Sequence, residues 1–382
     1  MSQPKTNPTL LWGALILGAL GVGATYATAG HERFWANWVL WFILMFTLAM
    51  GALFIAALEH VVAAKWSVPI RRIPERLATL ILPAIPVGLI ALGALPVLYP
   101  GTRPEAALHP ILKGKAFWLS IPFFSTRTVI AFILAAVSLA ILVGGSLKQD
   151  TTKDPQFNVR ARKFAPGFMA IFAIVITLLA FDWLSGLTPE WYSDIFGVYV
   201  FAGAFLSALA ATSLSVITLQ DEGRLQGVKA DHIYNLGGFL FAFTVFWSYI
   251  GFAQYMLMWY ANLPDEVIYY HIRLTGTWRA VTIFMAISHF ILPFFAMVTR
   301  DAKRDPRRLR LVAIIMLGAH FLDIYWLIFP NLGSAPRFSW PELSFALFFV
   351  AGILLWVRGA MQKGEDMPVG DPFLREGLEF RL

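Results

Sequence analysis

Ten stretches of this 382-residue sequence are long and apolar enough to cross a lipid bilayer, and no other feature constrains the fold as strongly. A hydrocarbon core of about 30 Å needs roughly 20 mostly apolar residues per helix. The stretches run approximately over 9–28, 34–63, 76–98, 125–147, 164–186, 192–219, 232–262, 276–299, 309–329 and 340–361. Because a backbone in lipid must satisfy its own hydrogen bonds, the sequence predicts an all-α integral membrane protein.

The composition agrees with this interpretation and excludes several other kinds of protein. Hydrophobic residues make up 58% of the sequence, charged residues make up 14%, and the mean hydropathy is +0.66. A soluble domain carries roughly 25% charged residues, and a disordered chain combines low hydrophobicity with high charge. The sequence has no cysteine, which excludes disulfides, thiolate zinc sites, cysteine-ligated iron–sulfur clusters and covalently attached c-type haem.

The basic residues are divided unevenly between the two sides of these stretches. Of the 30 lysines and arginines, all but eight lie in six places along the chain: Lys5, 64–76, 148–163, 220–231, 300–310 and the tail after 357. Since positive charge stays on the cytoplasmic side, we expect both termini there and expect no nucleic-acid partner. The first stretch is long for a signal peptide, so we predict that it is a helix.

Two parts of the sequence resemble each other and predict an internal duplication. The motif RTVIAF beginning at Arg127 matches RAVTIF beginning at Arg279, and FDWL around Asp182 matches LDIYWL around Asp323. The common order of these matches predicts two repeated four-helix bundles, over 34–186 and 192–329, flanked by the first and tenth helices. Four helices per unit give both copies the same orientation in the membrane.

Ionisable side chains inside apolar stretches are costly, so each is a functional candidate. His289 and His320 fall near mid-membrane, and His320 and Asp323 are three residues apart on one helix face. Histidine suits proton transfer because its ordinary pKa is close to neutrality. We therefore predict a proton path formed by Asp182, Asp194, His289, His320, Asp323 and Tyr325, with an inner mouth at Glu59 and His60.

Structural roles are the alternative for part of this set. Ion pairs could pin helices together, with Arg127 and Arg279 facing one of the carboxylates of Asp182, Asp194 and Asp323. The two histidines could instead hold a haem, which we disfavour because they form only one pair. No metal site is predicted, because no acidic or histidine cluster has the spacing of ligands.

Aromatic side chains crowd the seventh stretch. Packing and interfacial belts account for most aromatic residues of a membrane protein. The alternative interpretation is a groove for an isoprenoid quinone, formed by Trp247, Tyr249, Gln254 and Tyr255.

Two segments carry a resemblance to a known family. They read FDWLSGLTPEWYSDIFGVY over 181–199 and FWSYIGFAQYMLMWYANLPDE over 246–266. Both resemble the ActF-type integral membrane subunits of bacterial alternative complex III, which are related to the NrfD and polysulfide-reductase membrane subunits. The ten stretches, the doubled unit and the segment 320–326 fit the same pattern. Glu190 stands where the family usually has histidine.

This resemblance implies an integral membrane subunit of a quinol:electron-acceptor oxidoreductase in the bacterial cytoplasmic (inner) membrane. The subunit would be a scaffold and proton conduit without its own redox centre. The implied partners are a multihaem cytochrome c, an iron–sulfur and molybdopterin-like subunit, a larger NrfD-like sister subunit and membrane lipids. Haem and iron–sulfur clusters would be held only by these partners, and the main site for menaquinone or ubiquinone by the sister subunit.

Two other functions stay open. The chain could itself bind a quinone and take part in quinol oxidation. The duplication and the polar residues at mid-membrane are also typical of secondary transporters, although the paired, Gly- or Pro-broken helices of such proteins are missing.

Overall fold

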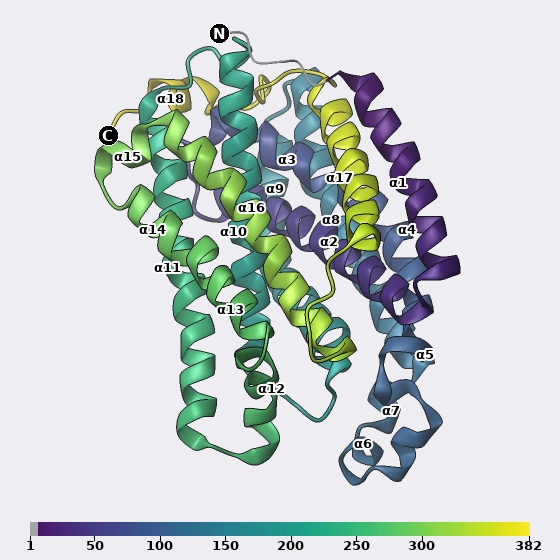
Figure 1. Ribbon diagram of the computed structural model, residues 1–382. Helices are drawn as coiled ribbons and strands as arrows, with labels where there is room; N and C mark the ends of the chain where they lie inside the picture. Colours follow the sequence, from purple (N-terminus) through teal and green to yellow (C-terminus); the bar gives the residue numbers. More distant parts are fainter. Residues whose placement is uncertain (1–6) are drawn as a thin grey trace.

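The computed structural model describes residues 7–382, so the basic residue Lys5 lies outside the described residues. The described chain consists of helices and connecting turns, without a strand (Figure 1). Ten of its segments are long and apolar enough to span a membrane, which confirms the predicted all-α membrane fold. They are Pro8–Thr28, His31–Val61, Arg72–Leu98, Ile121–Thr152, Gln156–Leu187, Phe196–Asp221, Ala230–Ala261, Trp278–Met297, Pro306–Leu332 and Trp340–Met361.

Seven of these spans contain one long α-helix each, and three consist of several pieces. The single helices are α1 (Pro8–Thr28), α2 (His31–Val61), α8 (Ile121–Thr152), α10 (Phe196–Asp221), α11 (Ala230–Ala261), α16 (Pro306–Ile328) and α17 (Trp340–Met361). The third span contains α3 (Arg72–Ala78), α4 (Ile81–Ala91) and α5 (Leu95–Leu98). The fifth span contains α9 (Gln156–Leu178) and the π-helix η5 (Leu179–Leu184). The eighth span contains α13 (Trp278–Ala286), the π-helix η7 (Ile287–Ile291) and α14 (Leu292–Met297).

The remaining α-helices lie outside the spans. They are α6 (Pro110–Gly114), α7 (Ala116–Leu119), α12 (Pro264–Leu274), α15 (Arg300–Arg304) and α18 (Leu374–Glu379).

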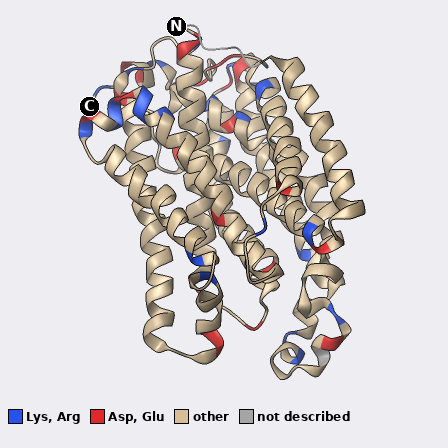
Figure 2. Cartoon of the chain, in the orientation of Figure 1, with Lys and Arg blue, Asp and Glu red and all other residues tan. Residues whose placement is uncertain are grey.

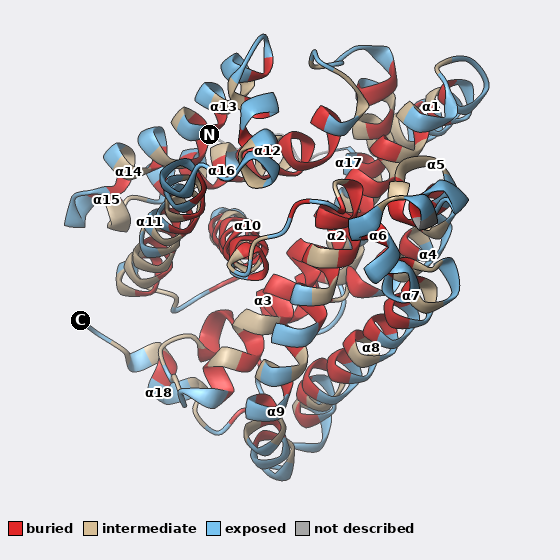
Figure 3. Cartoon of the chain, turned by 90° about the horizontal axis from the view of Figure 1, so that it is seen from below, coloured by how far each residue is buried: buried red, intermediate tan, exposed pale blue. Residues whose placement is uncertain are grey.

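The spans form two groups of helices joined through α2 and α10. The first helix group contains α2, α4, α8 and α9, and the second contains α10, α11, α14 and α16; within each group the helices pack on one another. In Figure 3, α2 and α10 lie in the middle and are largely buried, whereas the outer helices expose one side. A Cβ at Gly51 of α2 would lie 2.2 Å from the carbonyl oxygen of Ala204, so the glycine lets α2 approach α10 closely.

The first and last spans pack against each other beside these groups. Gly18 of α1 permits this contact, because a Cβ there would lie 2.4 Å from the backbone nitrogen of Phe348 on α17. Small residues at helix interfaces bring backbones together in lipid, where packing replaces the hydrophobic effect as the driving force.

The two ends of the molecule differ in charge and in shape. The start of α1 and the C-terminus lie at the same end, called here the termini side, and most lysines and arginines of the described chain gather there (Figure 1 and Figure 2). At the opposite end two parts project beyond the other helices: the segment from α5 to α7, and the end of α11 with α12 (Figure 1). This end is called the projecting side.

Candidate functional site

A cluster of polar side chains lies inside the second helix group. Helix α16 supplies His320 and Asp323, whose spacing of three residues places them on one face, and η7 supplies His289. These three residues, called here the middle cluster, are fully or almost fully buried, and one ligand atom from each lies within 4.8 Å of the others. The fold therefore brings together three groups that the sequence placed on two different helices.

The carboxylate of Asp323 is held by neutral hydrogen-bond donors. The hydroxyl of Tyr199 on α10 donates to Oδ1 at 2.5 Å, and the indole Nε1 of Trp247 on α11 donates to Oδ2 at 3.2 Å. Among residues 7–382, no lysine or arginine forms an ion pair with this carboxylate within 4.0 Å. Both oxygens of this buried carboxyl group are thus hydrogen-bonded, and no basic side chain of the described residues forms an ion pair with it.

Thr47 on α2 occupies one ring nitrogen of His320. The hydroxyl oxygen of Thr47 lies 2.7 Å from the carbonyl oxygen of Ile43 and 3.1 Å from Nε2 of His320. When the hydroxyl donates its single hydrogen to Ile43, it accepts a bond from Nε2, and that nitrogen then carries the imidazole hydrogen. Nδ1 of His320 is then left with a free lone pair, and it has no hydrogen-bond partner within the described chain.

His289 is fully buried, and neither of its ring nitrogens has a hydrogen-bond partner among the described residues. Its ring stacks on the indole of Trp247, with centroids 3.7 Å apart and planes 14° from parallel. His289 lies in η7, and π-helical turns occur frequently at functional sites. Buried polar atoms almost always have a partner, so two such nitrogens in one side chain indicate a group that this chain alone does not supply.

The donor set of the middle cluster is suited to a metal ion. Two imidazole nitrogens and a carboxylate oxygen are ligands that zinc and other divalent transition metals accept. The sequence predicted no metal site because these residues show no ligand spacing along the chain. Chain spacing does not decide the matter in this fold, since helix packing brings His289 to His320 and Asp323.

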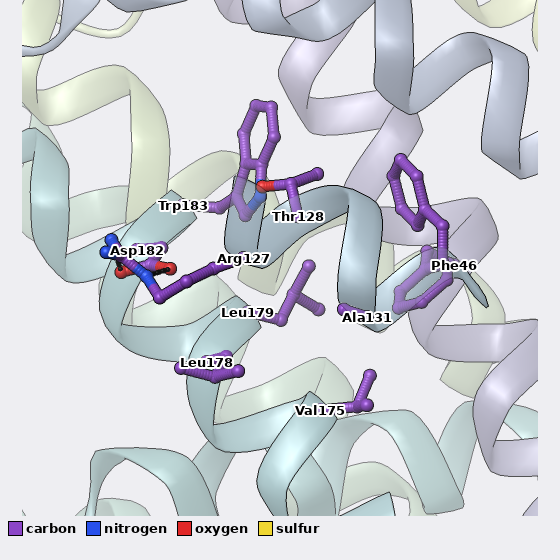
Figure 4. A pocket seen from close by; sticks show the side chains of 10 residues that line it. Phe46, Arg127, Thr128, Ala131, Val175, Leu178, Leu179, Asp182 and Trp183 are labelled. Atoms are coloured by element: carbon purple, nitrogen blue, oxygen red, sulfur yellow. Dashed lines mark hydrogen bonds and ion pairs between the residues drawn. The ribbon is translucent and has the colours of Figure 1, made fainter. Parts of the chain in front are cut away.

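A second polar group, formed by Arg127 and Asp182, lies in the first helix group (Figure 4). Arg127 on α8 holds Asp182 in η5 with two parallel hydrogen bonds of 2.9 Å, from Nε and from Nη2. Trp118 adds an indole hydrogen bond of 3.1 Å to Asp182, and its ring lies 4.0 Å from the guanidinium carbon. This buried pair is the structural ion pair proposed for Arg127 and Asp182.

The corresponding pair of the second half is not formed. Arg279 is exposed and has no ion-pair partner in the part of the chain that the structure describes. The buried arginine of this half is Arg273 on α12, which donates to the backbone carbonyls of Tyr269, Trp326 and Leu327. Burial lowers the pKa of Arg273, and the neighbouring tyrosines oppose that shift only in part.

Two further residues predicted for the proton path lie apart from the middle cluster. Asp194 is exposed, and the hydroxyl of Tyr325 donates to the carbonyl oxygen of Arg337 at 2.9 Å. Tyr325 therefore faces the connection between α16 and α17, although it follows Asp323 by only two residues.

The inner-mouth residues Glu59 and His60 are buried at the termini side. Arg71 donates to Glu59 and to Asp371 of the C-terminal tail, both at 2.7 Å. Burial alone would lower the pKa of Arg71, but its neighbouring carboxylates outweigh burial and raise it above its ordinary value. Within residues 7–382, no direct hydrogen bond joins this group, the middle cluster and the Arg127–Asp182 pair, so the predicted path falls into three separate groups.

The C-terminal tail binds the termini side through acidic residues that sequence reasoning missed. Asp366 accepts hydrogen bonds from Arg76 of α3 at 3.0 Å and from Arg224 at 2.6 Å. Burial by itself raises the pKa of Asp366, but these two arginines outweigh burial and hold the pKa below its ordinary value of 3.8. One sequence signal pointed to this contact: the tail carries acidic residues and is predicted to lie on the same side of the membrane as the basic loops.

The four residues predicted for a quinone groove are divided between the faces of α11. Trp247 and Gln254 are buried, and Trp247 belongs to the surroundings of Asp323. Tyr249 is 64% exposed on another face, and Tyr255 is half-buried. The structure therefore does not bring these side chains to one surface.

Comparison with known proteins adds no assignment. No protein-family model matches the chain, and no curated protein matches it.

Proposed function

We propose that this chain is an integral membrane subunit of a quinol:electron-acceptor oxidoreductase of the alternative complex III type. It would serve as a scaffold for partner subunits that hold the redox cofactors and the main quinol site. The proposal rests on the resemblance of 181–199 and 246–266 to ActF-type subunits, together with one structural observation, the apolar surface of the projecting side.

The projecting side exposes large apolar side chains on both of its projections. Helix α11 has 32 residues, which corresponds to about 48 Å and exceeds a hydrocarbon core of about 30 Å. Near its end Trp259 is 66% exposed and Tyr260 is 84% exposed, and Phe117 of the other projection is 74% exposed. Exposed apolar surface of this kind is typical of protein–protein contacts, which supports a subunit of a larger complex.

The two segments that carry the resemblance meet at the base of one projection. Trp191, in the first segment, donates its indole hydrogen to the sulfur of Met258 in the second at 3.4 Å. Its ring also stacks on Tyr269 of α12, with centroids 3.8 Å apart. These contacts give the shared sequence pattern a structural role, because they fix the direction in which α12 projects.

The proposed topology places the termini side in the cytoplasm of a bacterial cell, with the projecting side facing outward. The basic loops at the termini side support this orientation through the positive-inside rule. Partner subunits on the outer face would then cover the two projections. Proton transfer by the residues named above stays a prediction from the sequence.

The test is extraction of the native membrane in mild detergent, followed by a native gel, a haem stain and mass spectrometry of the band that contains this chain. We expect a large haem-positive band with multihaem cytochrome c, iron–sulfur and NrfD-like subunits. A small haem-free band that persists in the mildest detergent would contradict the proposal and favour a secondary transporter.

A matched pair of variants tests the observation that carries the proposal. The double variant Trp259→Ala/Tyr260→Ala should reduce co-purification of the partner subunits while leaving the chain folded. Tyr26→Ala is the control, since Tyr26 is also an exposed aromatic residue near the projecting side but lies on α1. Equal subunit yields from both variants would contradict a contact through the end of α11.

A further inference from the structure

We propose that His289, His320 and Asp323 bind one divalent transition-metal ion of the zinc type inside the second helix group. This inference goes beyond the proposed function and does not depend on it. It rests on the convergence of three donors, on the contact with Thr47 that leaves Nδ1 of His320 free, and on ring nitrogens that have no partner.

The three donors are close enough to share one ion. Their ligand atoms lie within 4.8 Å of one another. Zinc binds imidazole nitrogen at about 2.0–2.1 Å and carboxylate oxygen at about 2.0–2.2 Å, so two ligands of one tetrahedral ion lie roughly 3.3 Å apart. Binding therefore requires the three side chains to close on the ion from the separation seen here.

The lone pairs of His320 and Asp323 border the same small space beside Gly203 of α10. A Cβ added at Gly203 would lie 3.4 Å from Nδ1 of His320 and 3.6 Å from Oδ2 of Asp323. Glycine at this position therefore keeps a side chain away from both donor atoms. The bond from Nε2 of His320 to Thr47 leaves Nδ1 as the nitrogen available to the ion.

The surroundings of His320 and Asp323 match those of metal ligands in other proteins, whereas the second ring nitrogen of His289 has no acceptor among the described residues. A ligating histidine usually donates its second ring hydrogen to a fixed acceptor, and a ligating carboxylate is itself hydrogen-bonded. Thr47 is that acceptor for His320, and Tyr199 and Trp247 are the donors to Asp323. The stacked indole of Trp247 also fixes the ring plane of His289.

A metal ion accounts for the cluster better than a single proton. An ionised Asp323 needs a positive charge beside it, because a buried anion without a cation is costly. A proton on Asp323 would remove that charge, but it could reach only one of the free imidazole nitrogens and would leave the others without partners. One metal ion takes a lone pair from each group and cross-links η7 to α16. In that case these three residues do not act as the mobile proton carriers predicted from the sequence.

The experiment uses the full chain, purified in mild detergent and supplied with Zn²⁺ alone, with the metal content measured by elemental analysis after gel filtration. We expect about one ion per chain. His289→Ala and Asp323→Asn should remove it, and Tyr199→Phe should weaken binding roughly 10–100-fold, as loss of a hydrogen bond to a ligand does. His271→Ala and Asp194→Asn are matched controls, because both residues are exposed and lie outside the cluster, and they should keep the full metal content.

A spectroscopic measurement on the unsubstituted chain keeps the proposal testable if a variant fails to fold. After replacement of Zn²⁺ by Cu²⁺, electron paramagnetic resonance should show coupling to two imidazole nitrogens. A chain that takes up no metal, or metal content unchanged in the His289 and Asp323 variants, would overturn the assignment. These readouts are independent of the native gel, so the metal site and the proposed complex can fail separately.

Discussion

The two helix groups carry similar residues at matching places in the sequence but use them in different ways. In the first, Arg127 and Asp182 form a buried pair with two parallel hydrogen bonds of 2.9 Å. In the second, Arg279 is exposed, and Asp323 is held by Tyr199 and Trp247 beside two histidines. One carboxyl group is paired with an arginine of the chain, whereas the other has only neutral hydrogen-bond donors.

This difference shows that a duplicated motif does not fix a duplicated interaction. The buried guanidinium of the second half comes from Arg273 on α12 and binds backbone carbonyls, so it leaves the carboxylate of Asp323 to other partners. The Arg127–Asp182 pair is complete and has the character of a structural contact. The middle cluster lacks a cation and has the character of a binding site.

The largest expected effect comes from removing the guanidinium of the first group. Arg127→Ala should destabilise the chain by about 3–5 kcal/mol, because it leaves the buried carboxylate of Asp182 without its partner. Thermal unfolding in detergent measures this loss. Arg279→Ala is the matched control from the second half and should change stability by no more than about 0.5 kcal/mol.

A double variant checks that this loss arises from the stranded charge. Arg127→Leu/Asp182→Leu should recover most of the stability, since apolar side chains can replace a buried ion pair with little cost. Similar destabilisation by Arg127→Ala and Arg279→Ala would show that the two halves do not differ as described.

A metal ion should stabilise only the second group. With free Zn²⁺ at 100 times its Kd, the metal would raise the stability of the unsubstituted chain by about 2.7 kcal/mol. Asp323→Asn should abolish this increase, whereas Asp182→Asn should leave it intact although it removes a carboxylate at the matching place. Calorimetry with and without Zn²⁺ measures the increase, and an equal response of both variants would argue against a site at the middle cluster.

The neutral donors should matter more for Asp323 than for Asp182. Tyr199→Phe removes the hydroxyl donor to Asp323 and should cost about 1.5–3 kcal/mol in the metal-free chain, the range for hydrogen bonds to charged groups. Trp118→Phe removes a donor to Asp182, but Arg127 still neutralises that carboxylate, so we expect a smaller loss. Chemical denaturation of both variants gives the comparison, and a larger loss for Trp118→Phe would reverse it.

The smallest effect concerns the tail that joins both groups at the termini side. Asp366→Asn should cost on the order of 1 kcal/mol at neutral pH, because the pair is partly exposed. Since the folded-state pKa of Asp366 lies below 3.8, its contribution is complete above that pH and is lost as the pH falls further. The difference in unfolding temperature between wild type and variant should therefore shrink below about pH 4; a difference that stays constant with pH would contradict the role of this carboxylate.

Much of the architecture was predictable because it depends on local properties of the chain. Transfer of an apolar stretch into lipid depends on the composition of that stretch alone, so all ten spans were predicted. Most of the predicted ends lie within a few residues of the observed ends. The helices run longer than predicted at several ends, as at α8, which continues to Thr152. The apolar pattern ends where the hydrocarbon does, whereas the helix continues into the loop.

The candidate site was predictable only in part. His320 and Asp323 were expected on one face, since three residues along a helix bring two side chains together. Tyr199 and Thr47 were missed, because a single hydroxyl in an apolar helix gives no signal of what it faces. The prediction of an ion pair for Arg279 was wrong, because sequence similarity does not report whether a side chain points into the protein or away from it.

The sequence by itself determined that this chain is a ten-span helical membrane protein, because hydropathy acts on each segment separately. Only the tertiary structure decided that His289 meets His320 and Asp323. That meeting depends on a π-helical turn in one span, on a stacked indole from a second and on a glycine in a third. Contacts among separate helices follow from how their surfaces pack, and no local pattern along the chain encodes that packing.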